Sequence, residues 1–168
     1  MPDILFLSEC NADTALVRFL LPPSIQIDHV RGIHNVSNQM TLTSVNNATF
    51  RVIGIIDKDK DNVPTYFDQF ITINQWDRVT LKQHIDQDHH LIILDKAIET
   101  FILWNAEQIN LTVADYGFDP TLRQFCKALK RDSILTDPDY LRLLADLHAR
   151  NAPGFVTLHQ LLNDLIIP

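Results

Sequence analysis

The chain has 168 residues, 46% of them hydrophobic, and carries a formal net charge of −7 at neutral pH. A chain of this length forms one domain with a core of ordinary size. Its acidic balance argues against a protein that coats nucleic acid through a broad basic surface, because phosphate binding draws most of its affinity from lysine and arginine. An enzyme that meets phosphate through metal ions is not excluded.

The start of the chain and its cysteines indicate a cytoplasmic protein. The opening residues, MPDILFLSEC, lack the basic start and the long apolar stretch of a signal peptide, and no run is long enough to span a bilayer. Cys10 and Cys126 lie far apart in different contexts, which predicts buried thiols rather than a disulfide framework or a zinc cluster. We therefore expect no membrane partner.

The first hundred residues alternate between strand and helix patterns. An apolar run at 3–9 ends in an acid, and the segment NADTALVRFLLP after it has helical spacing and a Pro-Pro stop. The patterns that follow predict a strand at 24–30, a weaker helix at 35–45, a buried strand at 49–56, strands at 70–73 and 89–94, and a short helix around VTLKQHI at 79–85. From Lys96 onward the pattern is helical, over 96–108, 120–131, 137–150 and 154–166.

This order predicts an α/β fold with a mostly parallel central sheet, helices on both faces, and a C-terminal helical extension. We place the α/β domain at 1–108 and the helical extension at 109–168, packed on the same domain. In such sheets, sites lie at the carboxyl ends of the strands. Glu9 and Asp57 both fall at predicted strand ends, so this fold should bring them together.

An acidic cluster follows the most apolar strand of the chain. Three aspartates stand there at alternate positions, interleaved with lysines: Asp57, Asp59 and Asp61. Bunched carboxylates repel one another, and a divalent cation such as magnesium, which takes oxygen ligands, would offset that repulsion. Glu9, at a neighbouring strand end, would complete the site. The alternative is a solvated turn whose acids are balanced by Lys58 and Lys60.

A second metal interpretation is a calcium loop. The positions Asp57, Asp59 and Asp61, with Asp68 at the twelfth place, imitate the EF-hand spacing. The imitation is imperfect, because Asn62 occupies the place where glycine is expected, Pro64 interrupts the loop and a strand precedes it.

Three segments of the chain resemble the TOPRIM domain, and especially its OLD-like nuclease branch: FLSECNADTALVRFLLP, IIDKDKD and LIILDKAIETFIL. That family has a glutamate at the end of its first strand, often as Glu-Gly-x-x-Asp, and an Asp-x-Asp pair after its third. The matching residues are Glu9 and Asp13 for the first motif, Asp57 and Asp59 for the second, Asp61 as an additional acid, and Glu99 for a glutamate at a helix start. Cys10 stands where the family usually has glycine.

The resemblance implies metal-dependent hydrolysis of phosphodiesters in nucleic acid, DNA rather than RNA, with Mg²⁺ or Mn²⁺ as cofactor. It also implies a protein partner such as an ATPase. The implied catalytic residues are Glu9, Asp57, Asp59 and Lys96. The implied metal ligands are Glu9, Asp13, Asp57, Asp59, Asp61 and Glu99. Lys58, Lys60 and Lys96 are candidates for phosphate contacts, with solvated lysines beside acids as the alternative.

Two other functions stay open at this stage. One is a TOPRIM-like module that no longer cuts and acts as a binding or regulatory subunit. The other, more distant, is a response-regulator receiver, which needs an acid pair at the first strand and a lysine after the fifth, whereas Glu9 stands alone here.

The remaining polar residues predict structural roles. We expect His89 and His90 at the surface or at a strand edge. His29 and His34 flank Arg31 near the predicted site, where capping or packing is the expected role and phosphate binding the alternative. The basic segment LRQFCKALKR at 122–131 reads as a solvated helix face.

Overall fold

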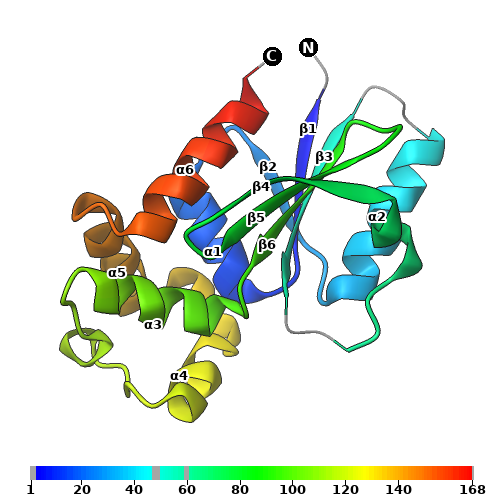
Figure 1. The fold of residues 1–168 in the computed structure, drawn as a ribbon. Helices are drawn as coiled ribbons and strands as arrows, with labels where there is room; N and C mark the ends of the chain where they lie inside the picture. The colour runs from blue at the N-terminus through cyan, green and yellow to red at the C-terminus, as the bar shows by residue number, and fades with distance from the viewer. Residues whose placement is uncertain (1–2, 47–49, 59–60, 168) are drawn as a thin grey trace.

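A six-stranded mixed sheet forms the centre of the molecule (Figure 1). The structure is a computed structural model and describes residues 3–46, 50–58 and 61–167. The strands are β1 (Ile4–Ser8), β2 (Gln26–His29), β3 (Arg51–Asp57), β4 (Phe70–Trp76), β5 (Val79–His84) and β6 (His89–Leu94), in the order β2-β1-β3-β6-β5-β4. The first four in that order run parallel, and β5 and β4 are antiparallel to their neighbours.

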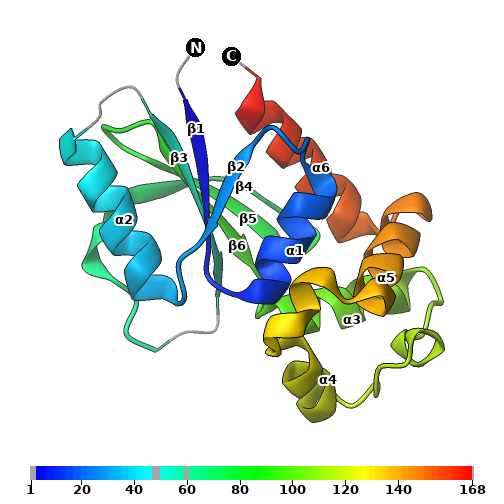
Figure 2. The ribbon, with the colours of Figure 1, turned by 180° about the vertical axis from the view of Figure 1, so that it is seen from behind.

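Helices cover both faces of this sheet. They are α1 (Asn11–Leu20), α2 (Ile33–Asn46), α3 (Ile98–Gln108), α4 (Leu122–Leu129), α5 (Pro138–Ala149) and α6 (Pro153–Ile166), with 3-10 turns η1 (Thr65–Gln69), η2 (Val113–Tyr116) and η3 (Asp132–Thr136). Helix α2 lies alone on one side, whereas α1, α3, α5 and α6 gather on the other (Figures 1 and 2). The predicted α/β class with helices on both faces is confirmed.

The two-sided burial follows from strand geometry, because successive side chains point to opposite faces. On β1, Phe6 enters the larger core with α1, α3, α5 and α6, while Leu7 enters the smaller core beneath α2. On β3, Ile53 and Ile55 join the larger core and Val52 joins the smaller. The larger core includes residues from β1 through α6, so the C-terminal helices pack on the same sheet as α1.

The predicted short helix at 79–85 is wrong, because this segment is strand β5, antiparallel to both β4 and β6. A tight turn at Asp77 and Arg78 joins β4 to β5, and both residues have positive φ, 49° and 64°. Two-residue hairpin turns that need positive φ usually carry Asn-Gly or Asp-Gly. Since Arg78 stands where glycine is typical, the turn lacks its usual signal in the sequence.

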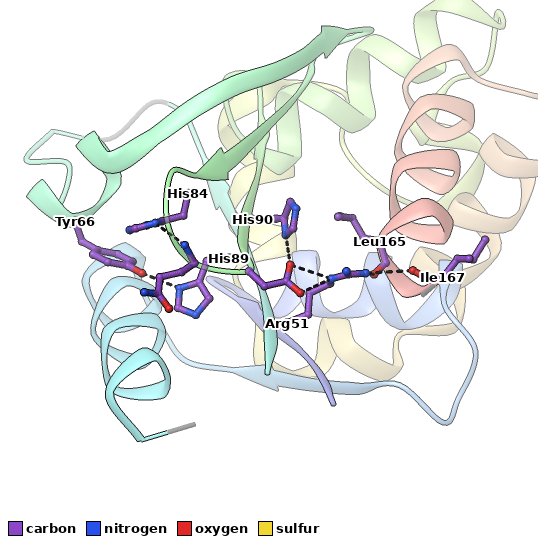
Figure 3. A network of polar contacts seen from close by, with 9 residues as sticks. Arg51, Tyr66, His84, His89, His90, Leu165 and Ile167 are labelled. Atoms are coloured by element: carbon purple, nitrogen blue, oxygen red, sulfur yellow. Dashed lines mark hydrogen bonds and ion pairs between the residues drawn. The ribbon is translucent and has the colours of Figure 1, made fainter. Parts of the chain in front are cut away.

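The expectation for His89 and His90 is also wrong. Both lie within β6 and are buried, with relative exposures of 2% and 8%. His89 Nδ1 is 2.7 Å from the hydroxyl of Tyr66, and His90 Nδ1 is 3.7 Å from a carboxylate oxygen of Asp88 (Figure 3). His89 thus has a hydrogen-bond partner, whereas His90 Nδ1 has none among the described residues.

Arg51 ties the sheet to the end of α6 (Figure 3). Its Nε donates to both oxygens of Asp88, and its Nη1 donates to the carbonyls of Leu165 and Ile167 at 2.9 and 3.2 Å. The first strand residue of β3 thus fixes the C-terminal turn of α6, which is a contact between segments more than a hundred residues apart.

Gly154 lets α6 approach α3, and we expect Gly154→Ala to lower the free energy of unfolding by about 1–3 kcal/mol. A Cβ at this position would lie 2.6 Å from both Asn105 Nδ2 and Phe101 Cε2, and both side chains are fully buried. The Gly154 amide also donates to Asn105 Oδ1 at 2.7 Å, so neither helix has room to shift. Urea unfolding checks this, with Val156→Ala, exposed on the same helix, as the control. An unchanged midpoint would contradict it.

Candidate functional site

A cavity of about 360 Å³ opens at the carboxyl ends of β1, β2 and β3. Its acidic lining comes from separate elements of the fold: Glu9, Asp57, Glu99 and Asp132. The first three of these side chains are almost buried, with relative exposures of 7–9%. The edge of the sheet where a site is expected for this fold class is therefore a concave acidic surface.

Glu9 and Asp57 meet because their strands are neighbours. Strands β1 and β3 pair in parallel, and the amide of Glu9 donates to the carbonyl of Ile55 at 3.2 Å. The amide of Asp57 in turn donates to Glu9 Oε2 at 3.2 Å. The expectation that the fold brings Glu9 and Asp57 together is confirmed.

Asp57 also caps helix α3. The residue before this helix is Ala97, which has no capping side chain, and the amide of Ile98 donates to Asp57 Oδ1 at 3.1 Å. A carboxylate at a helix N-terminus is stabilised by the orphan amides and the helix dipole. The same contact places Glu99, the next residue of α3, on the cavity wall.

Asp13 is a fully buried carboxyl beside this cavity rather than on its wall. Neither of its oxygens has a hydrogen-bond partner among the described residues. Burial raises the pKa of Asp13 well above its usual range, and the charges of Asp57, Glu9 and Glu99 raise it further. Both causes favour the protonated form of Asp13 in the folded state.

We expect Asp13→Asn to stabilise the protein at pH 7 relative to wild type, measured in EDTA. In wild type, the unfolded chain releases the Asp13 proton above its ordinary pKa of 3.8 while the folded chain retains it. As the pH rises, the free energy of unfolding of wild type thus falls by about 1.4 kcal/mol per pH unit until the pH passes the raised pKa of the folded state. The asparagine variant has no such loss. Urea unfolding at pH 4 and pH 7 measures the difference. Asp164→Asn, exposed on α6, is the control, and a variant weaker than wild type at pH 7 would contradict it.

Cys10, which stands in place of the glycine of the resembling family, caps helix α1 and lines the cavity. Its sulfur accepts a hydrogen bond from the amide of Asp13 at 3.4 Å. Burial, and after it the charge of Asp13, raises the pKa of the Cys10 thiol. A thiol with a raised pKa is a poor nucleophile, so Cys10 shapes the wall and is not a candidate for covalent chemistry.

Three basic side chains also line the cavity: His29, Arg31 and Lys130. Two backbone hydrogen bonds hold the loop after β2. The amide of Val30 donates to the carbonyl of Ser8 and the amide of Gly32 to the carbonyl of Glu9, each at 3.0 Å. Burial, and then the charge of Arg31, lowers the pKa of His29, which is therefore neutral at pH 7. The cavity thus combines acids with fixed cations, an arrangement suited to a metal ion and a phosphate together.

Other predicted site residues lie elsewhere. Asp61 and Lys96 are exposed and are not on the cavity wall, and Lys58 pairs with Asp95 at 3.4 Å. The predictions for Asp59 and Lys60 fall outside the described residues.

Lys130, Asp132 and Asn11 line the cavity without having been predicted from the sequence. Asn11 Nδ2 donates to Asp132 Oδ1 at 2.9 Å, which holds turn η3 against the start of α1. Lys130 belongs to the basic segment at 122–131, whose sequence pattern predicts a solvated helix face. That run of basic residues is the feature of the sequence that could have pointed to Lys130. The tertiary packing of α4 and η3 near α1 carries no local sequence pattern.

The donors at this site fit a hard divalent cation in kind. Carboxylate oxygens are the ligands such ions prefer, and both oxygens of buried Asp13 lack a described hydrogen-bond partner nearby. Among residues 3–46, 50–58 and 61–167, no three acidic, histidine or cysteine side chains are placed to hold one ion. Magnesium is commonly bound through one or two carboxylates plus waters and substrate phosphate, so Glu9 and Asp57 suffice as protein ligands.

Comparison of the chain with protein-family models, curated proteins and solved structures gave no match. Within the described residues, no helix has the length and apolar character needed to cross a membrane.

Proposed function

We propose that this protein is a metal-dependent phosphodiesterase acting on nucleic acid, a nuclease of the TOPRIM kind. The observation that carries the proposal is the presence of Glu9, Asp57 and Glu99 in one cavity that Arg31 and Lys130 also line. Carboxylates from two strand ends and a helix start supply the oxygen ligands that a hard divalent cation takes. Mg²⁺ or Mn²⁺ is the cofactor that this donor set suits.

Each residue has a distinct part in this function. Glu9 and Asp57 hold the cation, with Asp57 oriented by the Ile98 amide and Glu9 by the Asp57 amide. Arg31 and Lys130 contact the substrate phosphate, since a cation opposite the acids neutralises phosphate oxygens. Glu99, in the first turn of α3, takes or returns a proton at the attacking water or the leaving oxygen.

The cation, when bound, lowers the pKa of a bound water and neutralises phosphate charge. Hydrolysis ranks above topoisomerase chemistry because the described tyrosines are committed to packing. Tyr140 is fully buried and its hydroxyl donates to the Ala12 carbonyl at 3.3 Å. Tyr66 packs against the smaller core, and its hydroxyl is 2.7 Å from His89 Nδ1.

Calorimetric titration of Mn²⁺ into the purified protein tests the proposal. We expect wild type to bind and both Glu9→Gln and Asp57→Asn to bind at least about tenfold more weakly, because the two residues, 48 positions apart, share one ion. Asp164→Asn on α6 is the matched control. If only Asp57→Asn lost Mn²⁺ binding, a local site in the loop after β3, of the calcium type, would be favoured. If Mn²⁺ did not bind to wild type, the proposal would be overturned.

A second function, a non-catalytic binding or regulatory subunit, is favoured by one observation. Glu9 and Asp57 each accept a backbone hydrogen bond, so both carboxylates also serve the fold. In that case Mn²⁺ binds and no nucleic acid is cut under any tested condition.

A further inference from the structure

The exposed face of α4 is the most basic surface element of an otherwise acidic chain. The segment 122–131 contains Arg123, Lys127, Lys130 and Arg131 and no acid, whereas the whole chain has a net charge of −7. All four side chains are exposed. None of them makes an ion pair with any residue of the part that the structure describes.

Helix geometry aligns these cations. Arg123, Lys127 and Lys130 are spaced i, i+4 and i+7, which places them on one stripe of the helix. The opposite stripe, Phe125 and Leu129, is buried with 0% and 1% exposure. The cationic stripe is therefore held outward by the packing of the apolar one.

This stripe leads into the acidic cavity. Lys130 and Leu129 line that cavity, while Lys127 and Arg131 line a neighbouring one of about 310 Å³. Asp119 also lines the second cavity, but its carboxylate accepts hydrogen bonds from the amide and hydroxyl of Thr121. The end of α4 thus forms a wall of both hollows.

We propose that the α4 stripe binds the phosphate backbone of the nucleic-acid substrate and leads it to the acidic cavity. The inference rests on the proposed hydrolysis and extends it by naming the surface that receives the substrate. From Arg123 to Lys130 the helix rises about 10 Å, which matches about three backbone steps of 3.4 Å along one DNA strand. A membrane is a poorer occupant, because Leu122 is the only large apolar side chain described as exposed on α4, whereas interfacial helices bury a broad apolar face.

Fluorescence anisotropy with a labelled oligonucleotide in EDTA tests the inference, using single-stranded and duplex DNA and an RNA of the same sequence. We expect binding whose log affinity falls linearly with log salt. The double variant Arg123→Gln/Lys127→Gln should bind about tenfold more weakly at low salt, and its slope should fall by about 1.4–1.8, the value for two lost phosphate contacts.

The control is Arg18→Gln/Arg150→Gln, which removes the same charge from exposed positions in the last turn of α1 and at the end of α5. We expect it to retain the wild-type slope. Three results would overturn the inference. The two double variants could weaken oligonucleotide binding equally, or wild type could bind the oligonucleotide no more tightly than polyglutamate. Wild type could also bind anionic vesicles in preference to the oligonucleotide. If wild type binds no metal but Arg123→Gln/Lys127→Gln still weakens oligonucleotide binding, only the proposed hydrolysis is overturned. The two failures are therefore distinguishable.

Discussion

Under the proposed hydrolysis, Asp57→Asn is expected to lower the rate of Mn²⁺-dependent cleavage of DNA by roughly a hundredfold or more, with the fold intact. Asparagine keeps an oxygen that accepts the Ile98 amide hydrogen bond, so helix α3 retains its cap. What is lost is the negative charge at the centre of the acidic cavity. The measurement is initial cleavage rate against metal concentration, with circular dichroism as the check on folding.

Two further variants make this result specific. Asp164→Asn removes the same charge from an exposed position on α6 and should leave the rate unchanged. Asp61→Asn changes an exposed acid just beyond the strand, outside the cavity wall. If Asp61→Asn abolished cleavage as fully as Asp57→Asn, the ion would belong to the loop after β3, and the assignment to the cavity would be wrong.

His89→Gln is expected to remove much of the acid sensitivity of the fold. Burial, and then the neighbouring His84, lowers the pKa of His89 to about 4 from the ordinary 6.5. Above pH 6.5 both states hold a neutral imidazole and the stability is fully present. As the pH falls from 6.5 toward 4, only the unfolded chain takes up the proton, so stability is lost, by on the order of 3 kcal/mol.

The comparison is made between variant and wild type by urea unfolding at pH 7 and pH 4. Glutamine retains a polar group toward Tyr66, so its cost at pH 7 is small, about 1 kcal/mol. The free energy of unfolding of the variant should therefore rise relative to that of wild type as the pH falls. His34→Gln, exposed on α2, is the matched control. The same acid sensitivity in His89→Gln and wild type would show that another group, such as His84 or His90, carries it.

Asp13 and His89 act on stability in opposite directions as the pH changes. The buried carboxyl makes wild type weaker as the pH rises, and the buried imidazole makes it stronger. The pH dependence of the stability of wild type is then flatter than either contribution, so each contribution is measured as the difference between a variant and wild type.

The sequence was most informative where burial is periodic. The order of strands and helices up to β3, and the four helical segments after Lys96, follow from apolar spacing that the two cores impose. The sites at strand ends follow as well, since Glu9 and Asp57 terminate adjacent parallel strands. These features depend on local pattern together with one rule of sheet topology.

The parts that were missed depend on tertiary contacts. Strand β5 was read as a helix because its apolar alternation covers only Val79 and Leu81, and the hairpin turn carries Arg78 in place of glycine. The sequence points to the surface for His89 and His90 because the groups that bury them come from other segments: β3 pairs with both, β5 pairs with His90, and Tyr66 contacts His89. Lys130 reaches the cavity only through the packing of α4, which no local spacing encodes.

The position of β6 in the sheet has a consequence for synthesis of the protein. This strand alone joins the parallel set β2-β1-β3 to the β4–β5 hairpin, pairing with β3 on one side and β5 on the other. A growing chain that has not yet released residue 94 from the ribosome therefore presents the almost wholly buried strand β3 as an open edge. Open apolar edges invite pairing with other chains. A translational pause that holds β6 inside the ribosome would favour aggregation, whereas a pause after β6 has emerged would allow the sheet to close.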